Sequence, residues 1–203
     1  MRTTLALVIV SLVLSGNASG GDPDSSLTAR LDSERGLRLG LSIPYVNSFM
    51  VNKQSGSGSG AGFFGIACEL DVPLAVERSV STQVGGAMDF PLPILAAIDY
   101  PGEHELYTTV FINVRYNVLH DPLSYGIGLH ASILQWTYWG KEVEFNAKRI
   151  NRGLGISAMV QYQLLESLAA RVNYQPMVFS SGVTLFSGYQ HFLSLEAMFA
   201  FDL

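Results

Sequence analysis

The sequence predicts an all-β fold, an eight-stranded antiparallel up-and-down transmembrane β-barrel. The chain has 203 residues, of which 48% are hydrophobic and only 14% charged, against roughly 25% charged residues in an ordinary soluble domain. It nevertheless lacks the run of about 20 apolar residues that a transmembrane helix needs. From Leu37 onward, apolar residues instead recur at every second position, which is the period of a β-strand.

The first four alternating segments are 37–45, 64–72, 79–90 and 106–118. Apolar residues occupy one face of each, namely Leu39, Leu41 and Ile43; Ile66, Cys68 and Leu70; Val80 and Val84; and Val110, Ile112 and Val114. Small or polar residues lie between them, namely Gly40 and Ser42; Ala67 and Glu69; Ser81 and Gln83; and Asn113 and Arg115. Each segment is therefore expected to be a strand with one apolar face. The single cysteine, Cys68, belongs to that face, where a thiol behaves as a small hydrophobe.

The second half of the chain repeats the pattern in segments 125–133, 153–163, 168–175 and 193–203. Their apolar positions are Ile127, Leu129 and Ile133; Leu154, Ile156 and Val160; Leu168, Ala170 and Val172; and Leu193, Leu195, Phe199 and Phe201. Their alternate positions include Gly128, His130 and Ser132; Gly155 and Ser157; Arg171 and Asn173; and Ser194 and Glu196. These segments complete the eight expected strands.

The connections between the segments alternate in length. Residues 72–79, 119–124 and 164–167 are short links, whereas 51–60, 91–105, 139–149 and 180–188 are longer and polar or rich in glycine. Short turns at one end and long loops at the other are typical of barrels that span the outer membrane of bacteria. The pattern predicts four long loops at the cell surface.

Aromatic residues lie near both ends of the apolar face. They are Tyr45, Phe64, Phe90 and Tyr174 toward the long loops, and Tyr116, Tyr125, Tyr162, Phe199 and Phe201 toward the short turns. Two aromatic girdles that flank an aliphatic band favour a lipid bilayer over a protein core as the environment of this face.

The amino terminus has the order of a secretory signal. Arg2 is followed by the apolar run 5–14 and then by small residues up to Gly20. We expect a cleaved signal peptide over 1–20, a polar periplasmic segment over 21–35 and the barrel over 36–203.

The last segment, 192–203, alternates Phe, Leu and Ala with polar residues and ends with Phe201, Asp202 and Leu203. With the strand count and the loop pattern, it resembles the small outer-membrane β-barrel families of the OmpA-domain, OmpX and OmpW kind. The resemblance covers about 36–203. It implies a bacterial outer-membrane location with both termini in the periplasm, contact with outer-membrane lipid and lipopolysaccharide, and recognition of the final strand by the barrel-assembly machinery.

Charged residues alternate onto the inner face. They are Arg38, Glu69, Asp71, Arg115, Arg171, Glu196 and Asp202. Because an eight-stranded barrel is just wide enough to be filled by side chains, these charges are expected to form an ion-pair network inside it. The network is interpreted as structural filling. A gate that opens by exchanging ion-pair partners is the alternative.

His130, Ser132 and Glu144 resemble the His-x-Ser pair and later Glu of outer-membrane lipid A deacylases. Their parity instead places His130 and Ser132 inside the barrel, so a hydrogen-bonded interior histidine is favoured. His104, His120, His130 and His191 do not have the spacing of metal ligands, and neither metal nor cofactor is expected.

We expect a monomeric, non-enzymatic structural scaffold or a scaffold that presents surface loops to partners. A narrow or gated channel for small solutes or hydrophobic compounds is the first alternative, and a lipid A-modifying enzyme is the second. Nucleic acid is not an expected partner, because the net charge is −5 and the sequence has no basic stripe. The charged loop 139–149 is a candidate contact for lipopolysaccharide.

Overall fold

The structure is a computed structural model that describes residues 36–53, 56–90, 104–139, 146–181 and 189–203. The expected signal peptide 1–20, the polar segment 21–35 and Glu144 lie outside these ranges. In the ranges described, no helix is long and apolar enough to cross a membrane.

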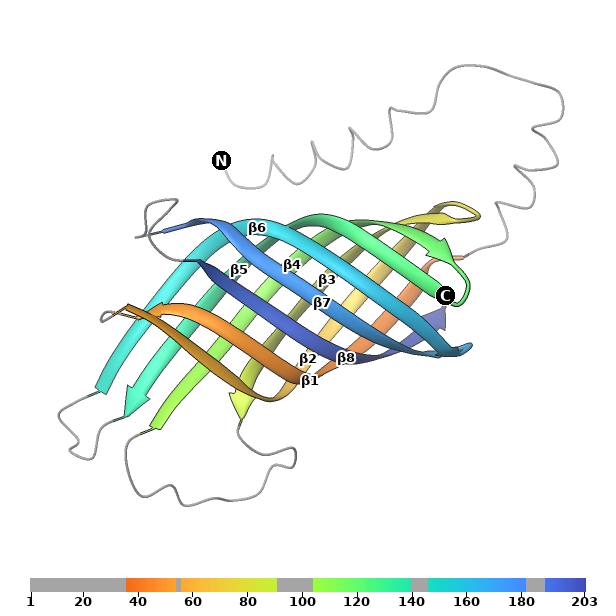
Figure 1. Cartoon of the computed structure of the whole chain (residues 1–203). Coiled ribbons are helices and arrows are strands. Elements are labelled where there is room, and N and C mark those ends of the chain that lie inside the picture. Colours follow the sequence, from red (N-terminus) through yellow and green to blue (C-terminus); the bar gives the residue numbers. More distant parts are fainter. Residues whose placement is uncertain (1–35, 54–55, 91–103, 140–145, 182–188) are drawn as a thin grey trace, which may run out of the picture. The chain divides into compact units, whose positions relative to one another are not determined.

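Eight strands make up the fold. They are β1 (Arg38–Lys53), β2 (Gly56–Ala75), β3 (Arg78–Phe90), β4 (His104–His120), β5 (Leu123–Trp139), β6 (Asn146–Leu165), β7 (Leu168–Ser180) and β8 (Gln190–Asp202). Each strand pairs antiparallel with its sequence neighbours, and β1 also pairs with β8, so the sheet closes on itself (Figure 1). The predicted eight-stranded up-and-down barrel is confirmed. Closure gives each of these strands a hydrogen-bonded neighbour on both sides over the lengths that the neighbours share.

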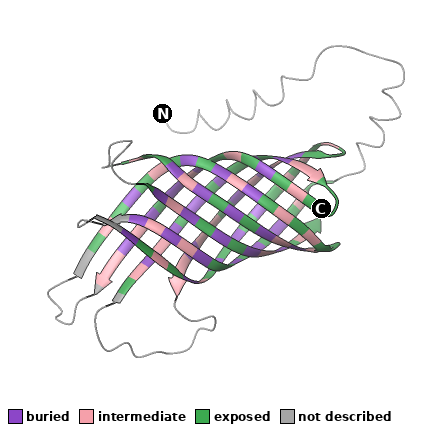
Figure 2. Ribbon diagram, viewed as in Figure 1, coloured by how far each residue is buried: buried purple, intermediate pink, exposed green. Residues whose placement is uncertain are grey.

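Buried and exposed residues alternate along every strand (Figure 2). In β5, for example, Leu129 and Ile133 are exposed on the outer wall, whereas His130 and Ser132 are buried inside. The outer wall is consequently apolar and the inner wall largely polar. This is the distribution required of a barrel surrounded by lipid.

One expected long loop is absent. The link predicted over 51–60 belongs mostly to β1 and β2, which remain paired up to Lys53 and Gly56. That prediction was wrong because a glycine- and serine-rich run usually marks a loop. A Cβ at Gly60 would collide with the Tyr107 ring, so the small residue here makes room for a side chain inside the barrel.

Two bulges exchange the faces of β1 and β2. The β1–β8 register shifts between Pro44 and Val46, and Tyr45 and Val46 both point outward. The β2–β3 register shifts around Phe64, whose φ is 102°, a value that non-glycine residues seldom adopt. Beyond the β1 bulge, odd-numbered residues such as Phe49 face inward instead of outward.

The outer wall carries the aromatic residues predicted as girdles. Tyr45, Phe64, Tyr116, Tyr125, Tyr162, Tyr174, Phe199 and Phe201 are exposed there, whereas Phe90 is only partly exposed and pairs with Phe63 in the sheet. Near the long loops, the His191 ring lies 5.7 Å from Tyr174 and 5.2 Å from Tyr189, between ring centroids.

A charge on the outer wall should cost free energy according to its depth. We expect Leu129→Arg, in the middle of the wall, to lower the free energy of unfolding in lipid vesicles by about 2–4 kcal/mol, and Leu165→Arg, beside a short turn, by about 0–1 kcal/mol. Both leucines are exposed on the outside. Chemical denaturation in vesicles measures the difference, and equal losses would contradict the expected position of the lipid band.

Candidate functional site

The barrel interior holds a buried ion cluster made by three strands. Glu69 of β2, Arg115 of β4 and Arg171 of β7 are 4%, 1% and 2% exposed. Arg171 donates to both carboxylate oxygens of Glu69, from Nη1 to Oε2 at 2.7 Å and from Nη2 to Oε1 at 2.8 Å. Arg115 donates to the same Oε2 through Nη2. The guanidinium groups of Arg115 and Arg171 also donate to Asn173 Oδ1 at 2.7 Å and Gln161 Oε1 at 2.8 Å, respectively.

Side-chain amides connect the inner wall to a second carboxylate, Glu196 of β8, which is also buried. Gln83 Nε2 donates to Glu196 Oε2 at 3.2 Å, and Asn113 Nδ2 donates to Gln83 Oε1 at 2.9 Å. Ser194 Oγ donates to the other oxygen of Glu196 at 2.7 Å. Two glutamates thus balance the two buried arginines, which meets the requirement that buried charges be paired and hydrogen-bonded.

The other predicted interior charges lie nearer the short-turn end. Arg38 Nε and Asp202 Oδ1 form an ion pair at 2.8 Å, but these side chains are 35% and 78% exposed. Asp71 accepts a hydrogen bond from Asn117 Nδ2 at 3.3 Å. The seven predicted charges are therefore divided between a buried cluster and a solvated rim.

A cavity of about 50 Å³ lies between this rim and the ion cluster, with Arg38, Asp71, Glu69 and Arg171 in its wall. Its volume exceeds the roughly 10–15 Å³ that one water molecule needs. The cavity thus has room for water beside the ion cluster.

The half of the interior nearer the long loops holds a buried hydrophobic cluster, beside polar residues such as Thr109 and Gln190. Phe49, Val51, Tyr107, Phe111, Leu134, Trp136, Met177 and Phe192 are buried there in one cluster. The Phe192 ring centroid lies 5.1 Å from that of Phe49 and 5.6 Å from that of Phe111. We call Phe49, Tyr107, Phe111, Trp136 and Phe192 the aromatic layer. Ring contacts join its members on β1, β4 and β8, on the long-loop side of the ion cluster.

Sequence reasoning did not identify the aromatic layer. Tyr107 and Phe111 have the same parity as Asn113 and Arg115 in β4, so their inward position was available from the alternation. Phe49 was not, because the bulge near Tyr45 changes the parity of β1.

The structure places His130 and Ser132 on the inner wall, where both are buried. His130 Nδ1 lies 3.0 Å from the backbone oxygen of Ile156. Within the described residues, no hydrogen bond joins His130 to Ser132, and no group of three or more His, Cys, Asp or Glu residues could hold a metal ion. Of the three residues that resemble the deacylase site, the structure describes His130 and Ser132, whereas Glu144 lies outside the described residues.

Comparison with known proteins identifies the architecture. No family model matches the sequence, and no curated protein sequence matches it. The solved structures include Ail, the attachment invasion locus protein of Yersinia pestis, at 11% identity and a TM-score of 0.57, covering 82% of this chain and 99% of Ail. The chain has the fold of the small outer-membrane β-barrels.

A second structure with this small-barrel fold is Ail in complex with the heparin analogue sucrose octasulfate, with 12% identity, a TM-score of 0.55 and coverage of 82% of this chain and 99% of Ail. Neisserial surface protein A matches at 12% identity and a TM-score of 0.48, covering 83% of this chain and 97% of that protein. The Ail matches support the likeness, which concerns the fold alone.

Removal of one partner should be far more costly in the buried ion cluster than in the rim pair. We expect Glu69→Gln to lower the unfolding free energy by about 3–5 kcal/mol, because two buried arginines lose their shared partner. Asp202→Asn should cost about 0–1 kcal/mol, as for an exposed pair. Urea unfolding in detergent micelles measures both.

The double variant Glu69→Gln/Arg171→Met provides a control, because it removes one of the two like charges that Glu69→Gln leaves facing each other. It should be more stable than Glu69→Gln alone. If Glu69→Gln is no more costly than Asp202→Asn, the two arginines do not depend on Glu69 as their buried partner.

Proposed function

We propose that this chain is a monomeric, non-enzymatic outer-membrane protein whose closed barrel is a scaffold for surface loops. The observation that carries the proposal is that two sets of side chains obstruct the interior, namely the ion cluster around Glu69 and the aromatic layer. A filled interior leaves no aqueous path for a solute. The variable part of such a protein is its loops, here residues 91–103, 140–145 and 182–188, which connect strands at one end of the barrel.

The proposed orientation has both termini in the periplasm and the long loops outside. Strand order supports it, because β1 begins and β8 ends at the same end as the short turns. In the families that the sequence resembles, the final strand is recognised by the barrel-assembly machinery. Here that strand is β8, whose partner across the closure is β1.

A gated channel is the second candidate, and Glu196 is the observation that favours it. Its charge acts on both Arg115 and Arg171, which are bound to Glu69. Exchange of an arginine from one glutamate to the other would rearrange the cluster. The aromatic layer would still obstruct the passage, which is why the scaffold is preferred.

Conductance in planar bilayers separates these two candidates. The wild-type protein and Arg115→Ala should both give no current steps, because the aromatic layer remains in place in each. The triple variant Arg115→Ala/Phe49→Ala/Phe192→Ala removes material from both layers and should conduct. Replacing the outward residues Phe199 and Phe201 by alanine, in place of the inner phenylalanines, should leave the barrel silent. Current steps from the wild type would overturn the closed scaffold in favour of the channel.

The non-enzymatic part of the proposal predicts unchanged lipid A. Cells that express wild type, Ser132→Ala or the matched interior variant Ser157→Ala should give the same lipid A mass spectrum as cells without the protein. Both serines are buried on the inner wall, away from the lipid. Loss of an acyl chain that depends on Ser132 and not on Ser157 would instead establish a lipid A-modifying enzyme.

A further inference from the structure

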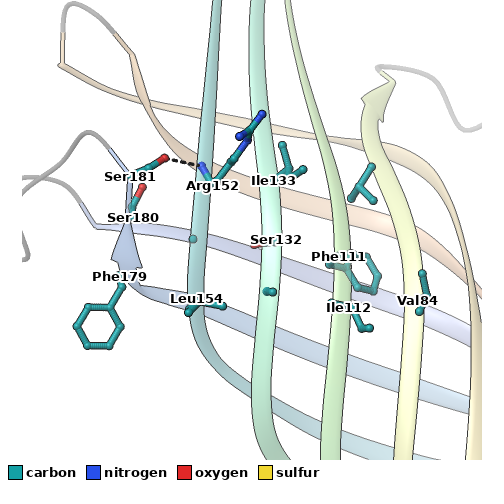
Figure 3. A pocket seen from close by; sticks show the side chains of 13 residues that line it. Val84, Phe111, Ile112, Ser132, Ile133, Arg152, Leu154, Phe179, Ser180 and Ser181 are labelled. Carbon is teal, nitrogen blue, oxygen red and sulfur yellow. Dashed lines mark hydrogen bonds between the residues drawn. The ribbon is translucent and has the colours of Figure 1, made fainter. Parts of the chain in front are cut away.

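The outer wall of the barrel has an apolar groove. Its volume is about 610 Å³, within the range of roughly 300–1,000 Å³ for small-molecule pockets. It runs across β3 to β7, with Val84 and Ile112 on one side and Leu154 and Phe179 on the other (Figure 3). Between Ile112 and Leu154, the paired residue of β5 is Ala131, whose side chain is small.

A local irregularity in the sheet shapes the groove. The β6–β7 register shifts between Leu154 and Gly155, and Val178 and Phe179 are both exposed on the outer wall. A Cβ at Gly153 would lie 2.6 Å from the Phe179 carbonyl oxygen, so glycine permits the close approach of β7 here. The Phe179 ring consequently lies beside a part of the outer wall where Gly153 has no side chain.

Arg152 stands at the end of the groove nearer the long loops. Its backbone is bonded to the residue that follows β7, because Ser181 N donates to Arg152 O at 2.8 Å and Arg152 N donates to Ser181 Oγ at 3.3 Å. Lys148 lies four residues earlier on the same face of β6, and both basic residues are exposed. Among the described carboxylates, none forms an ion pair with either side chain.

The depth of Arg152 follows from the outer face of β6, which is apolar from Leu154 to Leu164. About 11 residues at roughly 3.3 Å each, tilted by about 45°, span about 25 Å, the height of the apolar band of outer-membrane barrels. Arg152 therefore lies at the boundary of the band, at the level of lipid headgroups.

We propose that this groove binds one acyl chain of a phosphorylated lipid of the outer leaflet, with the lipid phosphate held by Arg152 and Lys148. The assignment to the outer leaflet rests on the orientation given under the proposed function. We choose a phosphorylated lipid because its negative phosphate complements the two basic side chains. An arginine guanidinium can bind a phosphate through two parallel hydrogen bonds. The groove alone would not select a lipid, because all acyl chains are equally apolar. The cations supply the selectivity.

Native mass spectrometry of the protein released from nanodiscs tests this proposal. The discs contain phosphatidylcholine with either bisphosphorylated lipid A or the same lipid without its phosphates. Wild type should retain one molecule of the phosphorylated lipid. Arg152→Gln/Lys148→Gln should retain about tenfold less or lower still, which corresponds to the loss of a charge-assisted contact.

Matched variants separate the two halves of the site. Ala131→Trp fills the groove and should lower retention, whereas Ala158→Trp, on the same outer wall nearer the short turns, should not. Arg78→Gln removes an exposed arginine beside a short turn and should also have no effect. Equal retention by all variants, or equal retention of the lipid without phosphates, would overturn the proposal.

Failure of the groove and failure of the scaffold give different results. Heat-modifiable gel migration and the absence of conductance report the closed barrel in each preparation. A closed, silent barrel that retains no phosphorylated lipid overturns the groove alone. A conducting barrel that retains the lipid overturns the closed scaffold and supports the groove.

Discussion

Backbone hydrogen bonding between β1 and β8 is the constraint on which the rest of the structure depends. A sheet in hydrocarbon has no water to satisfy its edges, so it must close. Closure of eight strands leaves an interior that only side chains can fill. The polar face of each strand is then enclosed, and residues such as Glu69, Arg115 and Arg171 must find partners across the barrel. The ion cluster is thus a consequence of the closed sheet as much as a feature of the sequence.

The network of bonded charges and amides occupies only the half of the interior nearer the short turns. Near the short turns, charges and amides bond to one another, and beyond them the wall changes to Phe49, Phe111, Phe192 and their neighbours. The bulge near Tyr45 makes this change possible in β1, because one extra residue exchanges the inward and outward faces. The same strand can therefore contribute Ser42 to the polar half and Phe49 to the aromatic layer.

Alternation was sufficient to predict the strand number and the parity of most residues, because it follows directly from strand geometry. The barrel topology also required the alternating lengths of the connections and the aromatic girdles. It did not predict where parity changes, and the inward position of Phe49 could not be obtained without the bulge. Composition was misleading at Gly56–Gly60, where the need for room beside Tyr107 outweighs the usual preference of glycine for loops. The partners of Glu69 depend on distances across the barrel, which a single sequence does not contain. The outer groove likewise depends on a register shift that alternation cannot reveal.

The ion pair between Glu69 and Arg171 also constrains the order of assembly. The two residues are 102 positions apart, and their strands are brought face to face only by the curved, closed sheet. Until β7 has joined the sheet, Arg171 lacks this partner, whereas Glu69 can already bond to Arg115 of β4, which is 46 positions away. The complete pairing of Glu69 therefore requires strands from both halves of the chain.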